Sequence, residues 1–158
     1  MLSKLSWLIF FIVGLLPITS YADDKTDINK ILNQTEAPAG IVFEILGSNG
    51  EYLTQALTKV QAYKEHLQKK FPNIDITVVS HGSEQFALTK NNAIKFKKAH
   101  NKVKRLVEND VTVHICETHA SWRDITAEDF PDYISPSPQG PVQIKQYQEL
   151  GYTLVIID

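Results

Sequence analysis

Cysteine is almost missing from this chain: Cys116 is the only cysteine among 158 residues. No disulfide can form within the chain, which excludes the small secreted scaffolds that depend on an even and dense set of cysteines. A lipid-attachment cysteine near the amino terminus is excluded as well. Stability must therefore come from ordinary packing of apolar side chains.

Long apolar runs are also scarce, and the one that exists spans Trp7–Leu16. Its length of about ten residues is well short of the roughly 20 that a membrane-spanning helix needs. Lys4 precedes it, while the helix-breaking Pro17 and small residues up to Ala22 follow it. This order is typical of a secretory signal peptide, so we expect residues 1–22 to be removed and the mature protein to be periplasmic, without stable membrane insertion. The alternative is that the run is retained as a membrane anchor.

Basic residues do not outnumber acidic ones. The chain has 16 lysines and arginines against 18 aspartates and glutamates, for a net charge of −2. Removal of Lys4 with the signal peptide would make this balance more negative. Because a nucleic-acid-binding domain normally carries a basic excess, the charge argues against general binding of nucleic acid.

Familiar cofactor and hydrolase motifs are missing too. The loop Gly47–Gly50 lacks the Gly-Lys-Ser/Thr ending of a phosphate loop and the spacing of a dinucleotide fingerprint. We expect instead a turn in which Ser48 or Asn49 caps the next helix. Ser80 and His81 do not stand in the context of a nucleophile elbow. No cofactor is expected from these patterns.

Strand-like and helix-like segments alternate along residues 41–158. Apolar, β-branched runs predict strands, and apolar residues at helical spacing predict helices. The predicted strands are 41–46, 74–80, 111–116 and 152–157, and the predicted helices are 53–67, 93–107 and 142–150. In the proline-rich stretch 117–140 we expect only a helical turn at 124–129 and a short strand at 133–134. Residues 23–40 are interpreted as a polar leader that lies over the domain or is partly disordered.

Such alternation with short connections favours a parallel sheet covered by helices on both faces. Ligands of these folds bind outside the carboxyl ends of the strands, and Cys116 lies at the end of the strand 111–116. Alternation of side chains puts His114 on the same face as Cys116, and His119 follows three residues later. His81, at the end of another strand, reaches the same site if the two strands are neighbours.

A thiol in this position has two interpretations. As a thiolate, Cys116 attacks sulfur, carries a persulfide or forms a mixed disulfide, with a nearby imidazole assisting. As a packed side chain, Cys116 only fills core volume, as free cysteine often does. A third and weaker alternative is a copper or zinc site formed by His114, Cys116 and His119, although their spacing matches no standard structural zinc pattern.

Several segments resemble the DsrE/DsrF-like family. These segments are His81-Gly82, Val113–Thr118, Ile125–Phe130, Gly140–Ile144, Gln148 and Gly151-Tyr152. The resemblance extends over residues 41–158 and is most specific from Cys116 to Tyr152. It implies a DsrE-like domain of the α/β class, a three-layer α/β/α structure with a mostly parallel five-stranded sheet. It also implies a homo-oligomer, a trimer or a hexamer.

The resemblance also bears on the chemistry of the thiol. Cytoplasmic sulfur-relay members of the family carry a persulfide on a cysteine that matches Cys116, and His81 and Thr118 match other motif positions. This implies an exported sulfur carrier or thiol-redox partner, at most sulfurtransferase-like, that exchanges sulfur with a donor or acceptor protein. The alternative is a non-catalytic, oligomeric binding module in which Cys116 is structural.

Overall fold

The computed structural model describes residues 23–158, so the expected signal peptide at 1–22 lies outside the described residues. The strands in this part of the chain are β1 (Gly40–Ile45), β2 (Asp75–Ser80), β3 (Thr112–Cys116), β4 (Ser135–Ser137) and β5 (Tyr152–Ile157). The α-helices are α1 (Asp24–Leu32), α2 (Gly50–Lys70), α3 (Lys97–Val107), α4 (Glu117–Ser121) and α5 (Gly140–Glu149). Short 3-10 helices are η1 (Ser83–Leu88), η2 (Lys90–Asn92) and η3 (Ala127–Asp129). No helix within residues 23–158 combines the length and apolar character that crossing a bilayer requires.

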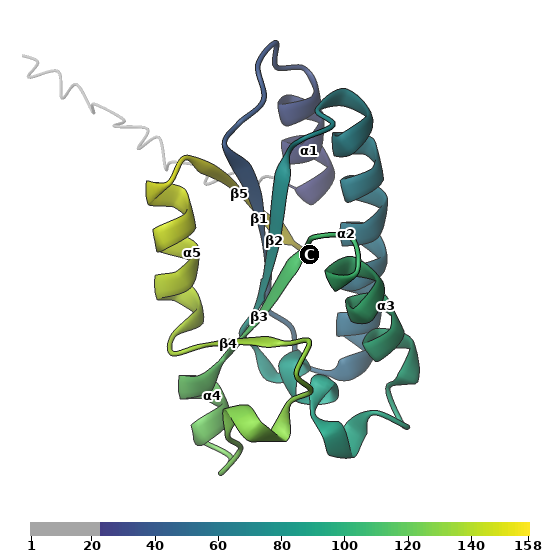
Figure 1. The fold of residues 1–158 in the computed structure, drawn as a ribbon, viewed down its shortest axis with the longest axis vertical. Helices are drawn as coiled ribbons and strands as arrows, with labels where there is room; N and C mark the ends of the chain where they lie inside the picture. Colours follow the sequence, from purple (N-terminus) through teal and green to yellow (C-terminus); the bar gives the residue numbers. More distant parts are fainter. Residues whose placement is uncertain (1–22) are drawn as a thin grey trace, which may run out of the picture.

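The strands form one sheet in the order β4-β3-β2-β1-β5, and every neighbouring pair is parallel. Figure 1 shows α5 on one face of this sheet and α2 and α3 on the other, with α1 beside α2. The predicted fold class, a three-layer α/β/α structure with a five-stranded parallel sheet, is confirmed. Because β2 pairs with β3, their carboxyl ends lie side by side.

The main core lies between the sheet and the helices α2 and α3. Side chains alternate along each strand, so Val78 points into this core while Val79 points to the opposite face, where Ile144 of α5 packs on it. Within residues 23–158, α5 is the one helix that covers this second face. Ile156 of β5 consequently stays 46% exposed there.

Two predicted elements are reproduced closely. The last strand occupies residues 152–157 as expected, and α2 contains the whole predicted helix 53–67 with a turn added at its amino end. Asn49 caps α2, because its Oδ1 accepts a hydrogen bond of 2.9 Å from the backbone N–H of Tyr52. The loop before α2 is therefore a capped turn, as predicted.

Residues 23–40 differ from the irregular polar leader that the sequence suggested. Asp24–Leu32 forms α1, and Ile28 and Ile31 are each 2% exposed within the main core. Burial acts to raise the pKa of Asp24, but hydrogen bonds, led by one of 2.7 Å from Lys59, outweigh it and hold that pKa below its usual value. The two isoleucines are too few to stand out among charged neighbours, which explains why the helix was missed.

The connecting segments also differ in detail. The helix expected across 93–107 begins only at Lys97, because residues 93–96 form a turn after η2. The short helix α4 was not expected and follows directly on Cys116. The predicted helical turn is η3, and the short strand lies at Ser135–Ser137 rather than 133–134. Pro136 is compatible with this strand because β4 is at the edge of the sheet.

Candidate functional site at the carboxyl edge of the sheet

Cys116 ends β3 beside the end of β2. The register pairs Ser80 with Ile115, so the residues that follow them, His81 and Cys116, lie next to one another at the carboxyl edge. Gly140 packs against both: a Cβ at this glycine would lie 2.5 Å from the Cβ of His81 and 3.4 Å from the Cβ of Cys116. The structure thus brings together two of the residues that the sequence singled out.

A cavity of about 420 Å³ opens at this edge. Its lining residues are Leu46, His81, Cys116, Thr118, His119, Trp122, Gln139 and Pro141. Cys116 is only 5% exposed, yet it lines this cavity and takes no part in the core beneath α2 and α3. Leu46 and Trp122 are 58% and 75% exposed and add apolar surface to the lining. The volume lies within the roughly 300–1,000 Å³ of typical small-molecule sites.

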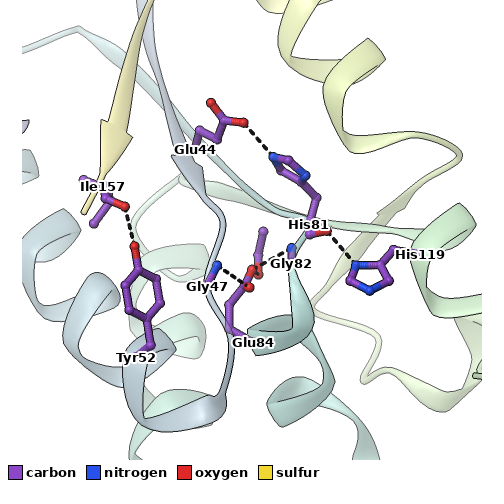
Figure 2. Close-up of polar contacts among 9 residues, drawn as sticks. Glu44, Gly47, Tyr52, His81, Gly82, Glu84, His119 and Ile157 are labelled. Atoms are coloured by element: carbon purple, nitrogen blue, oxygen red, sulfur yellow. Dashed lines mark hydrogen bonds and ion pairs between the residues drawn. The ribbon is translucent and has the colours of Figure 1, made fainter. Parts of the chain in front are cut away.

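Two hydrogen bonds fix the imidazoles of the cavity (Figure 2). Nε2 of His81 lies 2.7 Å from Oε1 of Glu44 in β1, and Nδ1 of His119 lies 2.8 Å from the carbonyl oxygen of His81. Because a carboxylate and a carbonyl oxygen only accept, both of these ring nitrogens carry protons. The ring of His119 also packs edge-on against Phe86, with the ring centroids 5.3 Å apart.

His114 is placed differently from the other histidines. Its Nδ1 donates to the carbonyl oxygen of Ser135 at 3.1 Å, so its Nε2 accepts from the hydroxyl of Tyr147 in α5 at 2.9 Å. Burial lowers the pKa of His114, which favours the neutral ring. With both nitrogens engaged beneath α5, His114 is a structural residue. The hypothesis that His114 assists the thiol stays a prediction, and these contacts do not support it.

Thr118 and Gln85 hold the chain around Cys116. The hydroxyl of Thr118 donates to the carbonyl oxygen of Pro138 at 2.7 Å, which ties α4 to the segment before α5. Oε1 of the fully buried Gln85 accepts from the backbone N–H of Cys116 at 2.8 Å. Nε2 of Gln85 is buried and has no hydrogen-bond partner within the described part of the chain. Thr118 thus lines the cavity, but its hydroxyl is already hydrogen-bonded to the backbone of Pro138.

The proposed copper or zinc site is not assembled. Among residues 23–158, the ligand atoms of His114, Cys116 and His119 do not form a group within 4.8 Å of one another. The one group of three that meets this limit in the described residues consists of Asp23, Asp24 and Asp158. The nitrogens of His114 and Nδ1 of His119 have protein partners instead of space for a metal.

A buried carboxylate fixes the loops beneath the cavity. Glu84 accepts from the backbone N–H groups of Gly47 at 2.6 Å and Gly82 at 3.0 Å, and from the hydroxyl of Ser80 at 2.7 Å (Figure 2). Gly82 must be a glycine, because a Cβ there would lie 2.3 Å from Oε2 of Glu84 and 2.6 Å from the carbonyl oxygen of Gly47. The ends of β1 and β2 are joined through this one side chain.

Tyr152, which matches a family motif position, lies far from the cavity, at the amino ends of the strands. It begins β5, pairs with Gly40 and donates a hydrogen bond from its hydroxyl to Asp75 at the start of β2. Burial and this carboxylate raise the pKa of Tyr152 to about 12. Tyr152 is therefore a structural residue at the amino ends of the strands.

Sequence reasoning missed Glu44 and Gln85. Glu44 had a signal, because it is the one charged residue of an otherwise apolar strand, 41–46. A charge buried on a sheet normally has a partner, and here the partner is His81. Gln85 had no signal, since a glutamine in a polar connecting segment is usually exposed.

Comparison with solved structures of other proteins confirms the fold. One is MTH1491, a protein of unknown function from Methanobacterium thermoautotrophicum, with 16% identity, a TM-score of 0.60, and coverage of 73% of this chain and 96% of that chain. The ychN protein from E. coli has 16% identity and a TM-score of 0.55, covering 75% and 97%. BT1422, a conserved protein of unknown function from Bacteroides thetaiotaomicron, has 11% identity and a TM-score of 0.51, covering 73% and 94%. At these identities the likeness shows the fold alone.

Sequence comparison supplies the family. The comparison with curated proteins returned no match for this chain. The model of the DsrE/DsrF-like family, in contrast, matches residues 42–156, which include β2, β3 and β4, most of β1 and β5, and the lining of the cavity. Together with the five-stranded parallel sheet, this match shows that the chain belongs to the DsrE/DsrF-like family.

Proposed function

We propose that this protein is an exported sulfur carrier or thiol-redox partner that works through Cys116. The observation that carries the proposal is that this sole thiol lines an open cavity together with His81, at the carboxyl edge where parallel sheets bind ligands. Cys116 is also outside the main core cluster beneath α2 and α3, although it is only 5% exposed. Family membership is consistent with this chemistry.

The transfer step moves one sulfur atom between thiols. The thiolate of Cys116 attacks the outer sulfur of a donor persulfide, R–S–SH, forming a new S–S bond as the donor's S–S bond breaks. The donor leaves as a thiolate, takes up the proton that Cys116 lost and becomes R–SH. Cys116 is then a persulfide, and no external oxidant or reductant is needed. Attack on a partner's disulfide follows the same course and gives a mixed disulfide with release of one thiol.

Mass spectrometry tests the carrier proposal. We expect residues 23–158, incubated with glutathione persulfide and desalted, to gain the mass of one sulfur atom. Treatment with a reducing thiol should remove this gain. Cys116→Ser is the matched control, since it keeps the size of the side chain and should stay at its original mass. Equal masses for the treated protein and the untreated protein would contradict the proposal.

The exposure of Cys116 supports a second candidate, a non-catalytic binding module with a structural cysteine. A side chain that is 5% exposed is nearly as covered as a core residue. On this alternative the cavity binds a small ligand or a partner, and Cys116→Ser changes stability by about 1 kcal/mol without changing binding. The reactivity of Cys116 in the folded protein distinguishes the two candidate functions, because a packed thiol reacts only when the structure opens.

Export and assembly belong to the same proposal. The pattern Lys4, Trp7–Leu16 and Ala22 supports a cleaved signal peptide and a periplasmic location. A homo-oligomer, a trimer or a hexamer, is proposed from family membership, and Ile156 and Val142, each 46% exposed, are apolar side chains that such an assembly could cover. A sulfur donor or acceptor protein in that compartment completes the proposal.

A further inference from the structure

We infer that Glu44 and His81 form a proton-accepting pair for the Cys116 thiol, with Glu44 as a positioning residue that acts through the His81 ring. The inference rests on the proposed function, because it assigns the group that takes the thiol proton before sulfur is transferred. It gives a role to a covered histidine–carboxylate hydrogen bond that the fold alone does not require. Polar pairs on the covered face of a sheet are otherwise readily replaced by apolar residues.

The first step concerns the state of the His81 ring. Its side chain is 10% exposed and that of Glu44 is 17% exposed, and 2.7 Å separates Nε2 from Oε1. The carboxylate holds the proton on Nε2, which leaves Nδ1 as the nitrogen with a free lone pair in the neutral ring. Nδ1 has no hydrogen-bond partner in the described residues, although the ring lines the cavity. The unpartnered nitrogen is thus available to a group at this site.

The second step places the thiol beside this ring. His81 and Cys116 directly follow the paired residues Ser80 and Ile115, and both border Gly140. Neighbouring parallel strands lie about 4.8 Å apart, a spacing that a thiol and an imidazole on the same face can span. Within the described part of the chain the thiol of Cys116 has no side-chain hydrogen bond, to His81 or to any other acceptor, so the inferred transfer requires the S–H group to turn toward Nδ1.

The inferred proton step runs as one exchange between the thiol and the ring. The S–H bond of Cys116 breaks and its proton moves to Nδ1 of His81, which becomes an imidazolium paired with the Glu44 carboxylate. The same proton passes to the leaving thiolate of the donor after the sulfur atom has moved. Glu44 touches neither the thiol nor the donor. It fixes the orientation of the ring and stabilises the positive charge that forms on it.

Two other titratable groups lie near the ring. Nδ1 of His119 donates to the carbonyl oxygen of His81, so this ring can accept a proton only through Nε2, and no carboxylate is hydrogen-bonded to it within the described residues. Glu84 is enclosed by the N–H groups of Gly47 and Gly82. The part of α5 that lines the cavity, Pro141, carries no charge.

The test is the rate at which iodoacetamide alkylates Cys116 in the folded protein across the neutral pH range. We expect Glu44→Gln to slow alkylation at pH 7 about tenfold, less than the 10²–10⁴-fold typical of losing a positioned base itself. Its rate should keep rising with pH where that of the wild type has levelled. If Glu44 acted only through the electrostatic repulsion between its negative charge and the thiolate of Cys116, removing that charge would favour the thiolate and speed alkylation. An unchanged or faster rate in Glu44→Gln therefore overturns the inference.

Two further variants keep the result decisive. Glu117→Gln removes a carboxylate next to Cys116 that is not bonded to His81, and should leave the rate equal or higher. His81→Gln should slow alkylation at least as much as Glu44→Gln, and adding Glu44→Gln to it should have no further effect. If Glu44→Gln folds poorly, His81→Gln alone decides the matter, because an unchanged alkylation rate in that variant also overturns the inference. If Glu44→Gln is alkylated slowly but the wild type takes up no sulfur, the carrier proposal fails and the inferred pair stands. If the wild type takes up sulfur but Glu44→Gln is alkylated at the normal rate, the inferred pair fails and the carrier proposal stands.

Discussion

Glu84→Ala is expected to lower the free energy of unfolding by about 3 kcal/mol or more. The carboxylate is fully buried and accepts from the N–H groups of Gly47 and Gly82 and from the hydroxyl of Ser80. Each buried donor left without an acceptor costs about 1–3 kcal/mol. Against a typical total stability of about 5–15 kcal/mol, this loss is large. Urea denaturation followed by circular dichroism measures it.

Two variants control this prediction. Glu84→Gln keeps the shape and one acceptor oxygen but turns an N–H₂ group toward donors, so we expect roughly half of the loss. Glu149→Ala removes a carboxylate that is 65% exposed and 3.8 Å from Lys145, and should change stability by less than about 0.5 kcal/mol. If Glu84→Ala were as stable as Glu149→Ala, Glu84 would not be holding the loops beneath the cavity.

Gly140→Ala is expected to disturb both stability and the reactivity of Cys116. The added Cβ would lie 2.5 Å from the Cβ and 3.0 Å from the Cγ of His81, which is too close for the ring to keep its place. Overpacking of this kind costs about 1–3 kcal/mol. Because the ring must move relative to Cys116, we also expect slower alkylation of the native thiol. Unfolding curves and iodoacetamide rates measure the two effects.

Gly151→Ala separates the two effects of Gly140→Ala. Gly151 has a φ of +88°, so alanine there is strained by about 1–2 kcal/mol, and this strain does not involve the candidate site. It follows α5 at the end remote from Gly140, and its replacement should leave the alkylation rate unchanged. Equal effects of the two glycine variants on alkylation would mean that reactivity follows global stability rather than the packing of His81.

The elements that could be predicted are those whose apolar pattern is carried by many residues. The final strand and α2 are long and periodic, and both match the structure. The helix α1 packs on the core through the buried Ile28 and Ile31 and the partly buried Leu32, and this packing is a tertiary effect that no local pattern reports. The shift of β4 toward Pro136 likewise reflects pairing with β3, which overrides local preference.

The candidate site was predictable to the extent that parallel sheets bind ligands at one edge. Cys116 and His81 end strands, so the strand order alone brings them together. His114 was assigned to the site because it shares a face with Cys116, but α5 covers that part of the face and Tyr147 engages the ring. Glu44 lies two residues before the end of the strand 41–46, and its link to His81 depends on the relative register of β1 and β2.

The most direct test measures how Cys116 reacts in the native protein as urea is raised below the unfolding transition. If the thiol is a working group at the cavity, its alkylation rate should be nearly independent of urea and should far exceed the rate expected from global unfolding. If Cys116 is merely packed, the rate should rise steeply with urea, in step with the population of opened molecules. A rate that tracks unfolding in this way would contradict the role proposed for the thiol.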